Sequence, residues 1–108
     1  MRHRTLTRRA AADVEQQLAQ IMQQIEEQNT LVEELDATVV ALSDAAESLA
    51  NSDASDMPEI VEAIAGIRQQ MMAASMRMGD ANGQLEALVA AYDDAQAQLQ
   101  QMQMAEAA

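Results

Sequence analysis

The sequence contains no cysteine, tryptophan, phenylalanine or lysine, and only one tyrosine, one proline and three glycines among its 108 residues. Without cysteine there are no disulfides and no thiol chemistry, and the compartment is left open. Few residues are aromatic or β-branched, which disfavours strands. A compact globule of this size usually buries several aromatic side chains, so extended packing of medium-sized residues is expected instead. These absences favour an all-α protein.

The groups that catalysis requires are also scarce. His3 is the only histidine, and no Glu-x-x-His pair of a di-iron bundle is present. The stretch "GDANG" at Gly79–Gly83 lacks the lysine of a phosphate-binding loop. The carboxylates, including the Glu26–Glu27 and Glu33–Glu34 pairs, are expected on solvated helix faces. We therefore predict that the protein is not an enzyme and that it uses no cofactor and no metal.

Long apolar runs are missing as well. No segment approaches ~18 consecutive apolar residues, so no transmembrane helix is predicted. The N-terminal "MRHRTLTRRAAAD" lacks the apolar core of a secretory signal peptide. A soluble protein is expected, in the cytoplasm or as part of a virion or secreted assembly, and the sequence does not choose among these locations.

Positive charge is confined to a few places in a chain whose formal net charge is -12. Four of the six arginines, Arg2, Arg4, Arg8 and Arg9, lie in the first nine residues. Residues 1–10 are therefore expected to form a flexible basic arm that could contact nucleic acid or another anionic surface. The acidic remainder of the chain should repel such surfaces.

A seven-residue hydrophobic repeat runs through both halves of the chain. In the first half, alternating steps of three and four residues select Ala11, Val14, Leu18, Ile21, Ile25, Gln28, Val32, Leu35, Val39, Leu42, Ala46 and Leu49. In the second half, the same steps select Met57, Ile60, Ile64, Ile67, Met71, Ala74, Met78, Ala81, Leu85, Leu88, Tyr92, Ala95, Leu99 and Met102. Such a repeat is typical of a coiled-coil seam. We predict a long antiparallel helical hairpin, a two-helix coiled coil that associates into a bundle or docks on a larger assembly.

The segment between the two seams has the composition of a loop. "ANSDASD" is small and polar, Asp56 with Glu59 resembles a capping box, and Pro58 suits the first turn of a helix. The predicted hairpin occupies residues 11–108, with helices over about 11–50 and 57–105 and a loop over about 51–56. Antiparallel layers are then expected to join residues whose numbers sum to 106, such as Leu49 with Met57 and Leu35 with Met71.

Gly79 and Gly83 raise the question of whether the second helix is interrupted. The repeat keeps its phase across them, which a turn would have no reason to preserve, so one continuous helix is favoured. In the predicted register Gln28, the only polar residue of the first seam, lies opposite Met78. The weak points of both helices would then coincide, either as tolerated irregularity or as a hinge or close-approach site.

Apolar residues beside the seam widen it beyond what two helices bury. Together with the last seam positions, which the register leaves beyond the first helix, they are the candidate contact residues: Met22, Leu31, Val61, Met72, Met76, Val89, Leu99 and Met102. Methionine suits adaptable binding surfaces. A structural protein that packs by this stripe within a larger complex, or that self-associates, is the leading interpretation, with a virion or secretion machine as an analogy only.

In outline the chain also resembles the WXG100 family of type VII secretion, whose members are helical hairpins of similar length without a signal peptide. The resemblance is architectural. The family carries Trp-x-Gly in its turn, where this chain reads "LANSDASDMPE", and Tyr-x-x-x-Asp/Glu as a secretion motif, where Tyr92 is followed by Gln96. It implies an alternative role as a small secreted partner protein.

Overall fold

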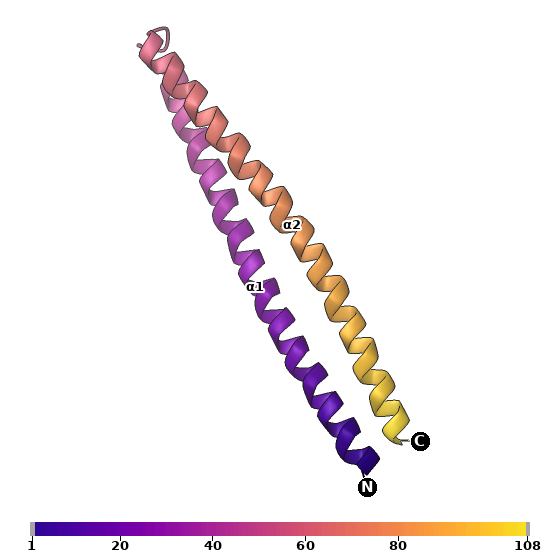
Figure 1. Ribbon diagram of the computed structural model, residues 1–108. Helices are drawn as coiled ribbons and strands as arrows, with labels where there is room; N and C mark the ends of the chain where they lie inside the picture. The colour runs from indigo at the N-terminus through magenta and orange to yellow at the C-terminus, as the bar shows by residue number, and fades with distance from the viewer. Residues whose placement is uncertain (1, 108) are drawn as a thin grey trace. The chain divides into compact units, whose positions relative to one another are not determined.

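Two long helices and the segment between them make up the described chain. The computed structural model describes the backbone of residues 2–107 and the side chains of residues 8–105. Helix α1 spans Arg2–Ala50 and helix α2 spans Pro58–Ala107, and no strand occurs between residues 2 and 107. The two helices are joined as a hairpin (Figure 1). The predicted all-α helical hairpin is confirmed.

The seven-residue repeat decides which side of each helix is covered. Each of the twelve positions selected in the first half is buried or half-buried, as are all but Met57 of those in the second half. The best buried side chains are Val14, Ile21, Leu35, Ala74, Ala81 and Ala95. Residues between these positions are mostly exposed and polar, which is the pattern of a narrow seam between two helices. Burial of this stripe is the main source of tertiary stabilisation.

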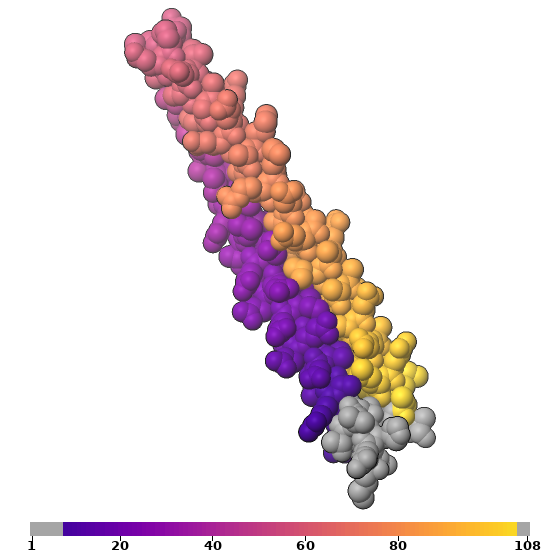
Figure 2. All heavy atoms as spheres, in the orientation of Figure 1, coloured from indigo at the N-terminus to yellow at the C-terminus, as the bar shows by residue number. Residues whose placement is uncertain are grey.

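The hairpin consists of two compact units. One combines the part of α1 up to Gln28 with the part of α2 from Gln84 onward, and the other comprises Asn29–Gly83. In the first unit, residues 8–28 lie beside residues 84–105, and side chains of the two segments meet between the ribbons (Figures 1 and 2). The start of α1 and the end of α2 lie at the same end of this unit (Figure 1). The second unit contains the connection between the helices.

The connection, residues 51–57, ends α1 by hydrogen bonds and without a left-handed residue. The Asn51 amide still donates to the Glu47 carbonyl (3.0 Å), and both the amide and the hydroxyl of Ser52 donate to the Leu49 carbonyl (3.3 and 2.7 Å). No residue between 2 and 107 has a positive φ. Ser52 thus provides the hydrogen bonds to the Leu49 carbonyl. At many helix C-termini, such carbonyls are instead satisfied by a turn that contains a left-handed glycine.

The start of α2 differs slightly from the prediction. The Met57 carbonyl accepts hydrogen bonds from the Ile60 and Val61 amides (both 3.0 Å), which makes Met57 the N-cap residue in place of Asp56. Pro58 is the first helical residue, as expected for a proline that has no amide hydrogen to leave unpaired. The connection is therefore one residue longer than the predicted loop.

The predicted register of the two helices is wrong at the connection. Met57 lies in the connection and is 47% exposed, so Leu49 has no seam partner there. Proline disfavours helical geometry at the residue before it, which explains why α2 cannot begin at Met57. When Leu49 is instead paired with Ile60, equal steps along the second unit bring Leu35 opposite Ala74. Both of these side chains are buried, as this register requires.

Helix α2 is continuous through both glycines, as predicted. A Cβ atom added at Gly79 or Gly83 would meet no atom within 4 Å, so no contact inside the hairpin requires glycine at either position. Each glycine lowers helix stability by about 1 kcal/mol relative to alanine. The two glycines therefore lower the stability of α2, and packing within the hairpin does not explain why they are present.

Helix α1 begins earlier than predicted. Residues 2–10, expected as a flexible arm, continue the helix to Arg2, although the side chains before Arg8 lie outside the described part. Nothing in "RHRTLTRRA" stops a helix, since the segment has no glycine or proline and is rich in arginine, a good helix former. The helix therefore reaches Arg2, and the flexibility of residues 1–10 stays a prediction.

Candidate interaction surfaces

Most of the predicted contact residues are exposed. Met72 and Met76 are each 68% exposed and Val61 is 54% exposed, and Met22 and Val89 also have large accessible fractions. Exposed apolar side chains on a helix are a common feature of binding surfaces. These five residues, Met22, Val61, Met72, Met76 and Val89, are called the exposed apolar set below.

Three other predicted contact residues are more covered than expected. Leu31, Leu99 and Met102 are half-buried. We expected Leu99 and Met102 to extend past the first helix, but α1 reaches back to Arg2. Leu31 lies next to the seam residue Val32 and is shielded with it. These three side chains belong largely to the seam of the hairpin.

The candidate set missed three exposed apolar residues. Val40, Met57 and Met104 have exposed fractions of 53%, 47% and 72%. Val40 follows the seam residue Val39, so its outward position could have been read from the repeat. Met57 lies three residues before Ile60, so the repeat places it in the seam. Only the effect of Pro58 on the preceding residue indicates that Met57 lies outside the helix.

The arginines of the N-terminal segment are partly described. Arg8 and Arg9 are exposed on the first turns of α1, whereas the side chains of Arg2 and Arg4 lie outside the described residues. The four arginines are therefore carried on a helix, and anion contact through them stays a prediction.

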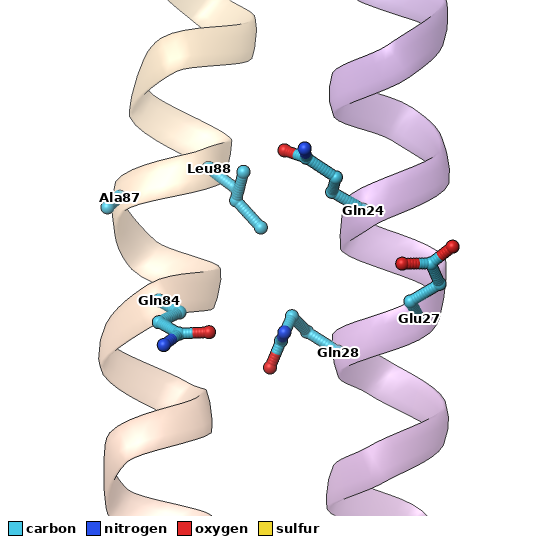
Figure 3. Close-up of a pocket in the computed structure, with 6 residues that line it drawn as sticks. All are labelled: Gln24, Glu27, Gln28, Gln84, Ala87 and Leu88. Carbon is cyan, nitrogen blue, oxygen red and sulfur yellow. The ribbon is translucent and has the colours of Figure 1, made fainter.

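A groove of about 460 Å³ lies between the helices of the first unit. It is lined by Gln24, Glu27, Gln28, Gln84, Ala87 and Leu88. Gln28 and Gln84 point toward each other across it, and Gln24 lies level with Leu88 (Figure 3). The residues that share the groove with Gln28 thus come from a later part of α2 than the predicted register implied, in the same direction as the shift in the second unit.

The Gln28 side chain is poorly satisfied in this groove. Its Oε1 atom is buried and has no hydrogen-bond partner among the described residues. The nearby Glu27 carboxylate instead accepts a hydrogen bond from Gln23 Nε2 on its own helix (3.4 Å). A buried acceptor without a partner costs about 1–3 kcal/mol. A polar side chain with an unpaired acceptor at a seam position is expected to weaken the seam.

Gln28→Leu should raise the free energy of unfolding by about 1–2 kcal/mol, because it removes the unsatisfied acceptor and completes the apolar seam. Urea denaturation followed by circular dichroism measures the change. Gln20→Leu, at an exposed position of α1 outside the groove, is the matched control and should shift stability by less than about 0.5 kcal/mol. An unchanged or lower stability of Gln28→Leu would show that the amide is well accommodated.

Two findings concern other kinds of site. Within the described residues, no three histidine, aspartate or glutamate side chains gather closely enough to hold a metal ion. Over the same part of the chain, neither helix has a stretch of the length and hydropathy needed to cross a membrane.

Comparison with known proteins assigns the chain to no family: no family model matches it, and neither a curated protein nor a solved structure shows significant similarity to it.

Proposed function

We propose that the protein is a non-enzymatic structural component, a helical hairpin that binds protein partners through its exposed apolar set within a larger complex. The observation that carries the proposal is the pair Met72 and Met76. They lie one helical turn apart on α2, and both are 68% exposed. A helix of a free monomer normally presents polar side chains at such positions.

The charge of the protein supports a role in assembly over one in nucleic-acid binding. The formal net charge is -12, and after Arg9 only Arg68 and Arg77 oppose the carboxylates. A surface of this sign repels phosphate backbones, whereas apolar contacts with a protein partner remain favourable. Methionine side chains are flexible and adapt to the shape of a partner.

The test is the size of the native complex in an extract of the cells that make the protein. The wild-type chain should elute, by size-exclusion chromatography, in a complex of more than twice its own mass of 11.7 kDa. The double variant Val61→Gln/Val89→Gln should be released from it, because both exposed apolar side chains are made polar. The control Glu62→Gln/Ala90→Gln changes two exposed neighbours and should stay in the complex.

Elution of the wild-type protein as a free hairpin in that extract would refute the assembly role. So would retention of Val61→Gln/Val89→Gln at wild-type levels together with unchanged retention of a Met72→Gln/Met76→Gln variant.

A further inference from the structure

One row of side chains on α2 points away from the seam. Arg68, Met72, Met76 and Asp80 follow one another at steps of four residues and are all exposed. Residues four apart on a helix form a ridge, with about 6 Å between neighbours along the axis. Met72 and Met76 each lie two residues from the buried Ala74, which is about 200° around the helix. The ridge is therefore on the side of α2 opposite its seam.

The charges along this ridge are unusual for the protein. Residues 63–79 contain no carboxylate, although the chain has eighteen, and they contain both of the arginines that follow Arg9. Arg68 stands at one end of the ridge and Asp80 at the other. The structure shows neither of them in an ion pair with a described residue. Along the ridge, a positive side chain is thus followed by two apolar side chains and then by a negative one.

We propose that this ridge docks a second copy of the chain, antiparallel to the first, through the same ridge. This inference rests on the proposed function and names one partner for the exposed methionines. Read backward, the ridge is negative, apolar, apolar, positive. A twofold axis between Met72 and Met76 therefore places Arg68 of each copy against Asp80 of the other and brings the four methionines together. Such self-complementarity is what a twofold-symmetric interface requires.

The glycines of α2 fit the same contact. Ser75, Gly79 and Gly83 form the next row of residues beside the methionine ridge, again at steps of four. A Cβ atom at Gly79 or Gly83 would meet nothing within 4 Å. Because glycine has no side chain, this row forms a shallow groove beside the methionine ridge. Ridges packed into the grooves between rows of this kind give the commonest class of helix crossing, and small residues let the two backbones approach closely. The contact uses the space that packing inside the hairpin leaves open.

The test is a charge exchange on the purified full chain. A single helix crossing buries little area, so the dimer should be detected by sedimentation equilibrium at protein concentrations on the order of 100 μM. At about 0.15 M salt the overall repulsion between acidic chains is screened beyond ~8 Å, whereas contacting charges still interact. Arg68→Asp and Asp80→Arg each create like-charged ends, and each should weaken dimerisation by about tenfold.

Mixing the two variants is the decisive measurement. An Arg68→Asp chain paired with an Asp80→Arg chain has opposite charges at both ends again, so the mixture should form a heterodimer with roughly wild-type affinity. Arg77→Asp changes the net charge by the same amount as Arg68→Asp, but Arg77 lies off the ridge. It is the matched control for Arg68→Asp and should leave dimerisation within about twofold. Circular dichroism verifies that each variant keeps its helix content.

Three outcomes would overturn the proposal: a wild-type chain that is monomeric at these concentrations, a mixture that stays as weak as its components, or an equal loss in Arg77→Asp. A monomeric purified chain that still elutes in a large complex from the cell extract would refute pairing between copies and leave the assembly role standing.

Discussion

Leu35→Ala should lower the free energy of unfolding by about 3 kcal/mol, a large part of the stability of a two-helix protein. Leu35 is only 6% exposed, and the register places it opposite Ala74, which is equally buried. Truncation removes apolar contact and leaves a cavity that the small alanine cannot fill, and buried Leu→Ala changes cost about 2–5 kcal/mol. Urea denaturation followed by far-ultraviolet circular dichroism measures the difference.

Val40→Ala is the control for this change, because it also shortens an apolar side chain of α1 but at an exposed position. It should alter stability by less than about 0.5 kcal/mol. Equal effects of Leu35→Ala and Val40→Ala would mean that the seam does not hold the two helices together.

Asn82→Pro should destabilise the hairpin by about 3 kcal/mol or more, since it interrupts α2 between the two glycines. Asn82 is exposed, so the effect comes from the backbone. Proline has no amide hydrogen to donate to the carbonyl four residues earlier, and its ring clashes with that carbonyl. If "GDANG" formed a turn in solution, proline at this position would be tolerated. Thermal and urea denaturation together measure the loss.

Asn82→Ala provides the comparison at the same position. Alanine removes the same side chain but favours helix, so it should leave stability unchanged or raise it by a few tenths of a kcal/mol. A small effect of proline, similar to that of alanine, would contradict a continuous α2 at this point.

The sequence predicted the fold where the signal is repeated many times. The hydrophobic repeat established the helix type and both seams, and it carried α2 correctly through Gly79 and Gly83. The register depends instead on where one helix begins. The repeat alone places Met57 in the seam, whereas the steric effect of Pro58 on the preceding residue starts α2 at Pro58 and leaves Met57 exposed in the connection.

The repeat also predicted which of the candidate contact residues are exposed, as far as exposure depends on position relative to the seam. Met72 and Met76 are outside the seam by count, and they are exposed. Leu99 and Met102 were expected to lie beyond the partner helix, but their cover depends on how far α1 extends toward its N-terminus. The groove at Gln28 could not be predicted, because its lining by Gln84 and Leu88 follows from the register.

The buried residues of the seam differ in size between the helices. Those of α1 are Val14, Ile21 and Leu35, whereas those of α2 are three alanines. At these positions, two copies of α1 would bring bulky side chains together, and two copies of α2 would bring alanines together and leave gaps. A large side chain on one helix opposite a small one on the other, as at Leu35 and Ala74, therefore favours pairing of α1 with α2 over pairing of either helix with its own kind.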